Sequence, residues 1–479
     1  MKIRNTLYIL GGMLLSMFAS CADEETFSSS KSNLLSFSTD TVRLDTTFSN
    51  VPTVTRSLWV FNKSGKGLRN ISVQLMNPVQ TGFRVNVDGS YLGPSSNYQA
   101  HDIEVRNGDS IRVFIECTPR TTNQSDPQSV DDDLVFTLES GVREVIHLNT
   151  YSWDATLVDG LTVSRDTTIS STRPLVFRKG ITVNEGATLT IAAGTTLYFH
   201  QDAGLDVYGR LVADGTVEKP VVLRGDRIDW MFDYLPYDLT PGQWQGVHFR
   251  STSFGNILRN TDLHSAYNAI VCDNSSLDQR KLLIENTSVH NNQGHGLLAH
   301  NVWVEAVNSI FSNSLGDCVN VVGGKLVLDF CTLAQFYPFS GNRRSAIYLS
   351  NHDEDGNLPL DASISNSLIT GYADDVVSGY KDDYPNMKYH FDYCVIRTPE
   401  PKDDEILNYQ NVVFEEVKDT TIYGEKNFKK LDTDNLWYDF RLDSVAAAIG
   451  KANPSSAVLY DRNGVHRDDK PDAGCYEFK

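Results

Sequence analysis

Apolar and small residues recur at fixed positions in six short segments of the second half of the chain. The segments begin 26, 22, 22, 36 and 27 residues apart. Their first position is mostly Asn, their second is Thr, Ser or Cys, and their fourth is always apolar. Repeats of this length, with a short apolar run and a turn residue in constant places, predict a solenoid. The six segments are residues 260–263, 286–289, 308–311, 330–333, 366–369 and 393–396.

A second short apolar run follows each of the first five segments, which gives two or three strands per coil and predicts a parallel β-helix. Equivalent positions then stack about 4.8 Å apart along the axis. The fourth position would fill the interior, and the small second position would fit beside it. Asn in the first position tolerates the left-handed backbone of a sharp bend. An open α/β solenoid is disfavoured because no unit shows an apolar spacing of 3.6. The second runs are residues 269–271, 296–298, 318–321, 346–349 and 375–377.

The unit that starts at Phe330 is about ten residues longer than its neighbours, and residues 352–360 are predicted to form a loop at one corner. Asp353, Asp355 and Asn357 place oxygen atoms at alternate positions of this loop, a pattern that calcium prefers. The rest of an EF-hand spacing is missing, so the alternative is a polar hairpin tip. No other cofactor is expected.

Cys331 and Cys394 share the second position but lie two rungs apart. That separation is about 9.6 Å, beyond the reach of a disulfide at about 7 Å. We expect both to be buried thiols.

The first part of the chain has a different pattern. Residues 34–155 contain about seven short runs with alternating apolar residues, separated by turn signals such as Asp88-Gly89 and Asn107-Gly108. This pattern favours an immunoglobulin-like β-sandwich, with a small open sheet packed on the solenoid as the alternative. The expected fold class is therefore all-β, an N-terminal sandwich followed by a right-handed parallel β-helix over residues 156–479.

An aromatic insertion at residues 224–246 interrupts the first coils. Trp230, Tyr234 and Tyr237 are candidate glycan-binding residues, because aromatic rings stack on sugar faces. Asp226, Asp229, Asp233 and Asp238 could bond sugar hydroxyls. The alternative is a loop whose rings cover the side of the helix, with Trp244 the most buried of them.

Residues 1–21 have the pattern of a lipoprotein signal peptide: Lys2 and Arg4, a short apolar core, and Phe18-Ala19-Ser20-Cys21. Cys21 would carry the lipid that anchors the chain to the membrane. Residues 22–33 would form a flexible tether. The acidic cluster in residues 22–25 resembles the surface-export tag of some Gram-negative lipoproteins, which implies an outer-membrane protein displayed on the cell surface.

The net charge is 42 − 61 = −19, which disfavours nucleic acid as a partner because phosphate binding needs a basic face. A nucleophile elbow, a phosphate-binding loop and a His-Glu-x-x-His zinc motif are all missing from the sequence.

Three stretches carry a family resemblance: residues 183–195, residues 243–247 with Trp244-Gln245-Gly246, and the tail, where residues 461–467 are followed by residues 471–477. Together they resemble right-handed parallel β-helix lipoproteins of the pectin-lyase-like superfamily. Ala473 and Cys475 depart from the usual closing pattern. The resemblance covers about residues 160–479 and implies the fold, while activities differ widely among such proteins. Arg467 and Glu477 are expected to pair and to close the last coil, within a closing segment at residues 436–479.

The repeats place mostly small and apolar residues on the sheet faces, which favours binding over catalysis. Our leading hypothesis is a non-catalytic surface lipoprotein whose β-helix binds a polysaccharide or a cell-envelope partner. One alternative is a carbohydrate-active enzyme, a polysaccharide lyase or glycoside hydrolase, acting in a groove of the β-helix. Another is an architectural component of the envelope.

Overall fold

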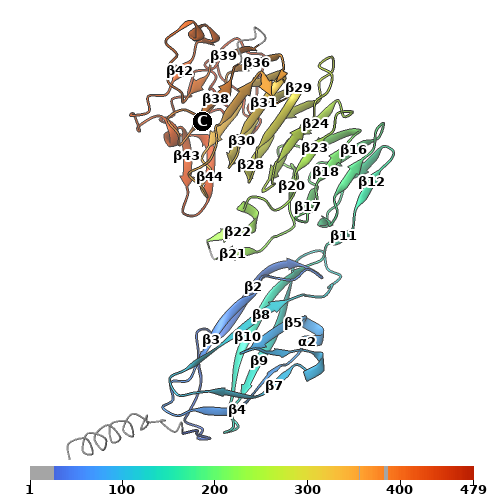
Figure 1. Cartoon of the computed structure of the whole chain (residues 1–479), viewed down its shortest axis with the longest axis vertical. Coiled ribbons are helices and arrows are strands. Elements are labelled where there is room, and N and C mark those ends of the chain that lie inside the picture. The colour runs from blue at the N-terminus through green and yellow to red at the C-terminus, as the bar shows by residue number, and fades with distance from the viewer. Residues whose placement is uncertain (1–25, 233, 355, 382–386) are drawn as a thin grey trace, which may run out of the picture. The chain divides into compact units, whose positions relative to one another are not determined.

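The computed structural model describes residues 26–232, 234–354, 356–381 and 387–479. The chain divides into two compact units, Met1–Trp153 and Asp154–Lys479. The first contains two sandwich sheets whose strands pair antiparallel except for β2 (Thr41–Phe48) with β10 (Arg143–Trp153), and the second is a parallel β-helix (Figure 1), so the predicted all-β fold class is confirmed. Within the described ranges, no helix is long and apolar enough to cross a membrane.

Two five-stranded sheets form the first unit. Their apolar residues alternate along most of the strands and meet in one core, to which Val85, Val113, Ile115 and Phe136 belong. One sheet contains β1 (Ser36–Phe37), β3 (Arg56–Phe61), β8 (Ser110–Cys117), β5 (Phe83–Val87) and β6 (Ser90–Leu92). The other contains β2 (Thr41–Phe48), β10 (Arg143–Trp153), β9 (Gln128–Thr137), β4 (Leu68–Leu75) and β7 (Gln99–Val105). In the described part of this unit, the short helices are α2 (Pro78–Thr81) and η1 (Pro94–Ser96).

An 11-stranded parallel sheet forms one side of the β-helix, with one strand from each coil. Its strands, in order, are β11 (Thr156–Val158), β14 (Leu175–Phe177), β17 (Thr196–Phe199), β20 (Val221–Gly225), β25 (Thr261–His264), β28 (Ser288–Asn292), β30 (Ile310–Ser314), β32 (Thr332–Gln335), β37 (Leu368–Gly371), β40 (Val395–Ile396) and β42 (Val413–Phe414).

A 17-stranded sheet supplies the remaining sides of the coils. Most coils add two short strands to it, whereas β29 and β31 run through both positions as single long strands. Its strands are β12 (Leu161–Val163), β13 (Thr167–Ile169), β15 (Ile181–Val183), β16 (Thr188–Ala192), β18 (Leu205–Val207), β19 (Arg210–Asp214), β23 (Val247–Phe249), β24 (Asn256–Arg259), β26 (Ile270–Cys272), β27 (Leu282–Glu285), β29 (Leu297–Val307), β31 (Val319–Asp329), β33 (Ile347–Ser350), β36 (Leu360–Ser365), β38 (Val377–Tyr380), β39 (Met387–Asp392) and β41 (Tyr409–Gln410).

The fourth position of the repeat forms one continuous column in the interior. Each of its six members is fully buried, and each is the register partner of the next along the 11-stranded sheet. The predicted stacking of the coils is therefore confirmed. The column consists of Leu263, Val289, Phe311, Leu333, Ile369 and Ile396.

The first position of the repeat makes the bend that precedes each strand. All six residues there have a positive φ, between 42° and 52°. Four of them are Asn, whose short polar side chain tolerates this left-handed conformation, as predicted; Phe330 and Tyr393 adopt it as well. The small second position links the rungs, because Thr287 Oγ1 accepts a hydrogen bond from the Thr261 amide at 3.2 Å.

Short elements outside the coils complete the second unit. The long repeat unit does contain a corner hairpin, formed by β34 (His352–Asp353) and β35 (Gly356–Asn357). Cys331 and Cys394 are buried free thiols. The other elements are β21 (Trp230–Phe232), β22 (Leu235–Pro236), β43 (Phe428–Asp432), β44 (Trp437–Leu442), η2 (Tyr237–Leu239), η3 (Asp404–Asn408) and η4 (Gly424–Asn427).

The C-terminal segment, residues 424–479, lies on the outer face of the 11-stranded sheet. Phe428, Leu442 and Ala448 pack there against outward residues of the coils such as Leu368 and Val395. The end of the segment is tied to two coils, because the Cys475 amide donates to Thr332 Oγ1 at 3.0 Å and the Gly474 amide donates to the Asn366 carbonyl at 2.8 Å.

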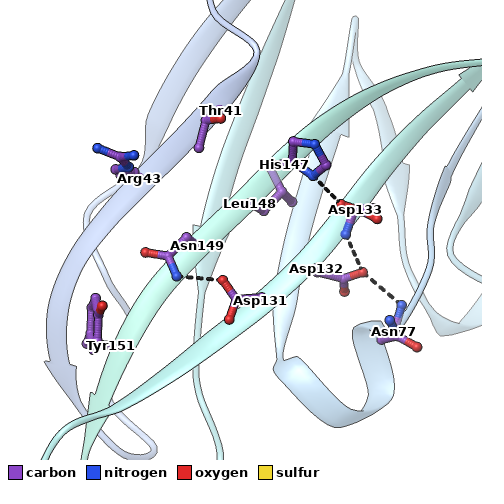
Figure 2. A pocket seen from close by; sticks show the side chains of 10 residues that line it. All are labelled: Thr41, Arg43, Asn77, Asp131, Asp132, Asp133, His147, Leu148, Asn149 and Tyr151. Carbon is purple, nitrogen blue, oxygen red and sulfur yellow. Dashed lines mark hydrogen bonds and ion pairs between the residues drawn. The ribbon is translucent and has the colours of Figure 1, made fainter.

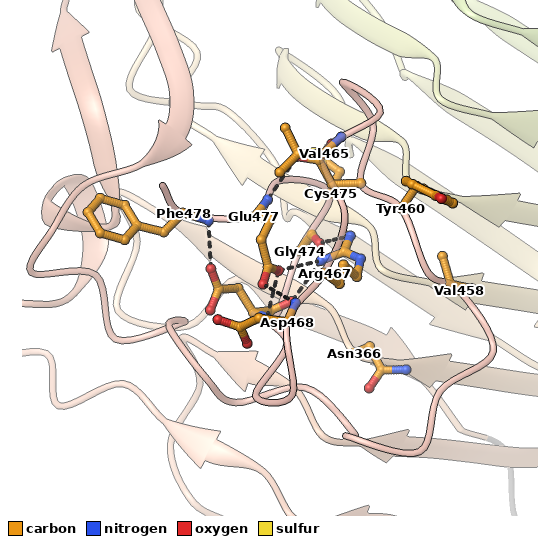
Figure 3. Close-up of polar contacts among 12 residues, drawn as sticks. Asn366, Val458, Tyr460, Val465, Arg467, Asp468, Gly474, Cys475, Glu477 and Phe478 are labelled. Carbon is orange, nitrogen blue, oxygen red and sulfur yellow. Dashed lines mark hydrogen bonds and ion pairs between the residues drawn. The ribbon is translucent and has the colours of Figure 1, made fainter.

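Arg467 and Glu477 do pair, inside this segment (Figure 3). Arg467 also donates to Asn308 Oδ1 at 3.0 Å, and its guanidinium lies 3.8 Å from the centroid of the Phe330 ring. Asn308 and Phe330 are corner residues of coils in the middle of the sheet. The expectation that this pair closes the last coil is therefore wrong. The pair instead attaches the C-terminal segment to the side of the β-helix, where the segment buries apolar residues that point outward from the coils.

Candidate functional site

Charged side chains line up on the outer face of the 11-stranded sheet, at β25 and β28. Leu263 and Val289 point into the core, so their neighbours in each strand point outward. Asp262 and His264 therefore leave β25 on the outer side. His290 leaves β28 on the same side, in register with His264.

The His264 imidazole bridges two carboxylates. Its Nδ1 lies 2.6 Å from Asp262 Oδ1, and its Nε2 lies 2.8 Å from Asp238 Oδ1. Asp238 comes from the aromatic insertion and is held in turn by Arg224 Nη1 at 2.7 Å. Burial would lower the pKa of His264, but the two carboxylates outweigh it and raise the pKa to about 9. The ring is thus fixed at both nitrogens.

His290 is the second imidazole of the group, which we call the His-Asp cluster (Asp262, His264 and His290). His290 Nε2 lies 3.1 Å from Asp262 Oδ1, and the two imidazole rings stack with their centroids 4.9 Å apart. Burial opposes the charge on Asp262, yet the imidazoles of His290 and His264 hold its pKa well below the usual range. Asp262 is therefore an ionised acceptor shared by both rings.

Trp244 packs in the core of the β-helix, on the inner side of this part of the sheet. The side chain is fully buried and stacks on Phe199 with centroids 4.7 Å apart. Its Nε1 donates to the His264 carbonyl at 2.8 Å. The prediction that Trp244 is buried is confirmed, and the cluster rests on a packed aromatic pair.

A cavity of about 590 Å³ opens beside the His-Asp cluster. The coils form one wall, where Asp262 and His290 are exposed to it, and the C-terminal segment forms the other. The cavity therefore brings together chemistry from segments far apart in the chain. Its lining includes Leu239, Asn291, Asn313, Asn435, Trp437, Tyr438, Asp439, Arg441 and Tyr476.

Two titratable side chains of the C-terminal segment line this cavity. The Arg441 guanidinium, 2.9 Å from Asp439 Oδ1, lowers the pKa of that carboxyl. Burial raises the pKa of Tyr476 to about 12, against the Arg462 guanidinium, which lowers it. Arg462 Nη1 donates to the Tyr476 hydroxyl at 2.9 Å, which leaves the phenolic proton for another acceptor. An ionised carboxylate and a neutral phenol thus line one cavity.

A larger cavity, of about 780 Å³, lies on the sandwich (Figure 2). The three consecutive aspartates that line it already form hydrogen bonds with other groups of the protein. Asp133 pairs with His147 at 2.7 Å, Asp131 accepts from Asn149 at 2.6 Å, and Asp132 accepts from the Asn77 amide at 2.9 Å. These contacts join β9, β10 and the start of α2, which is a structural role.

The predicted glycan-binding residues fall into two groups. Trp230 and Tyr234 are exposed, and the Tyr234 ring stacks on Phe232 with centroids 5.7 Å apart. Tyr237 instead lies under the Arg227 guanidinium, whose carbon is 4.0 Å from the centroid of the Tyr237 ring. The acidic residues of the insertion bind protein groups: Asp226 pairs with His200, Asp229 with Arg227, and Asp238 with Arg224 and His264; Asp233 lies outside the described residues.

The loop proposed for calcium is also engaged in internal contacts. Asp353 Oδ2 lies 2.6 Å from His300 Nε2, and Asn357 Oδ1 lies 3.0 Å from His352 Nδ1. Asp355 and the lipidation candidate Cys21 lie outside the described residues.

Sequence reasoning missed the His-Asp cluster and the facing residues Asp439 and Tyr476. A signal for the cluster was available in two successive units, where titratable residues stand next to the inward apolar position. One unit reads Asp262-Leu263-His264, and in the next unit His290 follows Val289. No comparable signal exists for Asp439 and Tyr476, because they follow the last repeat.

No family model matches the chain, and no curated protein matches it. Several solved structures show a distant likeness. One is a family 123 glycoside hydrolase from Clostridium perfringens, at 6% identity and a TM-score of 0.18; the match covers 26% of this chain and 26% of that chain, about a quarter of its length.

Two others match most of the chain. The Agl-KA catalytic domain shows 12% identity over 75% of this chain and 79% of that chain, with a TM-score of 0.22. The catalytic unit of a thermostable GH87 α-1,3-glucanase from Streptomyces thermodiastaticus shows 8% identity over 74% of this chain and 88% of that chain, also with a TM-score of 0.22. Similarity this low says nothing about the activity of this chain.

Proposed function

We propose that this chain is a carbohydrate-active enzyme that binds a glycan in the cavity between β25, β28 and the C-terminal segment and cleaves a glycosidic bond there. The observation that carries the proposal is the convergence of Asp262, His290, Asp439 and Tyr476 on one cavity. Small and apolar residues covering a sheet face would disfavour catalysis there. On this face titratable residues stand there instead.

A sugar fits the lining of this cavity. The Trp437 side chain is 62% exposed and lines it, and an exposed ring offers an apolar face on which a pyranose can stack. The amides of Asn291, Asn313 and Asn435 lie along the same cavity and can bond hydroxyl groups. One aromatic surface with several fixed polar groups is typical of a site that orients a polar ligand.

Proton transfer falls to the two titratable residues of the C-terminal segment, Asp439 and Tyr476. Asp439 is ionised and can accept a proton from water or attack the anomeric carbon itself. Tyr476 is neutral and can donate its phenolic proton to the leaving oxygen. In hydrolysis the carbon–oxygen bond breaks, the oxygen of water bonds to the anomeric carbon, and the two protons of water end on the leaving oxygen and the new hydroxyl. The His-Asp cluster positions the sugar from the opposite wall.

The test is a glycan array on the chain, with product release measured for each bound glycan. New reducing ends would support hydrolysis, and unsaturated ends would indicate elimination at the same site. Asp439→Asn and Tyr476→Phe should each lower turnover by about 10²–10⁴-fold while the glycan still binds. Trp437→Ala should instead weaken binding, by about tenfold.

Binding without turnover in the wild type would overturn the enzymatic proposal in favour of a non-catalytic glycan-binding protein. One structural fact favours that outcome: Asp262 and Asp439 are each neutralised by partners within the chain. Weaker binding in Trp230→Ala or Tyr234→Ala, with Trp437→Ala unaffected, would place the glycan on the aromatic insertion.

We also propose that Cys21 anchors the chain to the outer membrane, with the enzyme on the cell surface. The sequence of the signal peptide and the acidic residues after it support this. Cys21→Ala should abolish incorporation of labelled palmitate and release the protein from the membrane fraction. Protease added to intact cells should degrade the wild-type protein; full protection would place it on the inner leaflet.

A further inference from the structure

We propose that the His-Asp cluster is a binding site for one divalent metal ion such as Zn²⁺. Its ligands would be Asp262, His264 Nδ1 and His290 Nε2. One potential donor atom from each of the three residues lies within 4.8 Å of the other two. They project from two neighbouring rungs of a rigid sheet, so their spacing is set by the fold.

The hydrogen-bond geometry calls for positive charge at this point. Asp262 Oδ1 lies 2.6 Å from His264 Nδ1 and 3.1 Å from His290 Nε2. Lone pairs on oxygen and nitrogen repel each other at such distances unless a proton or a metal ion lies between them. Two separate protons could meet this need, but a single divalent ion meets it at both contacts.

The surroundings of His264 are those of a metal ligand. Its Nε2 lies 2.8 Å from Asp238, which accepts from Arg224 at 2.7 Å. A metal-bound imidazole usually donates its second N–H to a carboxylate in this way, which fixes the ring and makes the ligating nitrogen more basic. Asp238 is thus a positioning residue for the proposed site.

The donor set and the open side indicate the kind of ion. Two imidazoles and one carboxylate suit Zn²⁺ and its first-row neighbours better than calcium, which prefers oxygen alone. Tetrahedral ligands of Zn²⁺ are about 3.3 Å apart, so small side-chain rotations bring these three onto one ion. Asp262 and His290 line the 590 Å³ cavity, and the remaining coordination position would face it.

A second His–Asp pair on the other sheet provides a matched control. His248 Nε2 lies 2.6 Å from Asp273 Oδ1, much as His290 lies near Asp262. In the part of the chain that the structure describes, the His248 pair belongs to no group of three metal-ligating residues. A metal site at the His-Asp cluster should therefore survive loss of His248.

The experiment uses the full chain in detergent, without a His tag and stripped with EDTA, and titrates separate samples with Zn²⁺ and with Co²⁺. We expect one equivalent of either ion, with the visible absorption of low-coordinate Co²⁺. His290→Ala should weaken binding at least tenfold, whereas His248→Ala should leave it unchanged. Asp238→Asn should weaken it by about 10–100-fold and shift the Co²⁺ spectrum, which a purely structural role would not do.

His264 is buried, so its variant could fail to fold; His290 is partly exposed and serves as the primary test, with circular dichroism to show that the variant is folded. The proposal is overturned if the wild type binds no stoichiometric Zn²⁺, or if His290→Ala binds it with unchanged affinity. Metal binding is measured without a glycan, so a failed metal site and a failed glycosidic activity remain distinguishable.

Discussion

Arg467 and Glu477 form a buried ion pair, with Arg467 Nη1 3.3 Å from Glu477 Oε2 and both side chains 2% exposed. The guanidinium also donates to the Gly474 and Asp472 carbonyls and to Asn308 Oδ1. One arginine therefore connects the end of the chain to the corner of a coil. Since the C-terminal segment is one wall of the proposed active-site cavity, this contact positions half of the site.

Arg467→Ala should destabilise the β-helix by about 3–5 kcal/mol, because it leaves the buried Glu477 carboxylate without its partner. The urea midpoint of the β-helix transition measures the effect. Arg441→Ala is the matched control: the Arg441 side chain that pairs with Asp439 is 53% exposed, and a pair with such an exposed arginine contributes about 1 kcal/mol or less. Equal losses in the two variants would contradict the structural role of Arg467.

Asn286→Ala tests the reason for asparagine at the corners. Asn286 has a φ of 49°, a conformation that costs an ordinary L-residue about 1–2 kcal/mol. We expect Ala to lower the free energy of unfolding by about 1 kcal/mol and Gly, which adopts positive φ freely, to lower it less. Urea titration of both variants decides the point; a greater loss with Gly than with Ala would show that the side chain, and not the backbone, matters here.

The coils could be predicted from sequence because their information is local. Leu263 and Val289 occupy the same place in successive units, and stacking follows directly from that periodicity. The site depends on contacts across connections of unequal length. Asp238 reaches His264 from an insertion, and Asp439 faces His290 from a segment beyond the last repeat. No periodic pattern encodes where such segments return, because their path is set by packing against the finished sheet.

The aromatic insertion shows the same limit. Its rings are the conspicuous feature of the sequence. Trp244 packs inside, as predicted, but the glycan-binding candidate Tyr237 packs under Arg227. The contact that reaches the cluster is made by Asp238, a residue whose type alone gives no indication of its partner.

Trp244→Phe should cost the β-helix about 2–3 kcal/mol. The smaller ring leaves a void beside Phe199, and the His264 carbonyl loses the hydrogen bond from Nε1. Trp437→Phe is the matched control, since that ring is exposed and its replacement should change stability by about 0.5 kcal/mol or less. Thermal unfolding followed by circular dichroism compares the two; a Trp244→Phe variant as stable as the wild type would show that the aromatic pair does not support the cluster.

Asp472 should make stability fall as the pH rises. Burial, together with the neighbouring carboxylates of Glu477 and Asp468, raises the pKa of Asp472 to about 6, against the hydrogen bonds it accepts from the Phe478 and Gly450 amides. The folded state then binds the proton more tightly than the unfolded state, whose pKa is near 3.8. The resulting stabilisation is complete below the unfolded pKa and is lost as the pH rises through about 6.

Asp472→Asn isolates this contribution, because the amide cannot titrate while all other acidic groups are kept. A pKa difference of about two units corresponds to about 2–3 kcal/mol. The free energy of unfolding of Asp472→Asn, minus that of the wild type, should therefore rise by this amount between about pH 4 and pH 7. Urea titrations of both proteins across that range measure it. A constant difference would mean that the Phe478 and Gly450 amides outweigh burial and keep Asp472 ionised throughout.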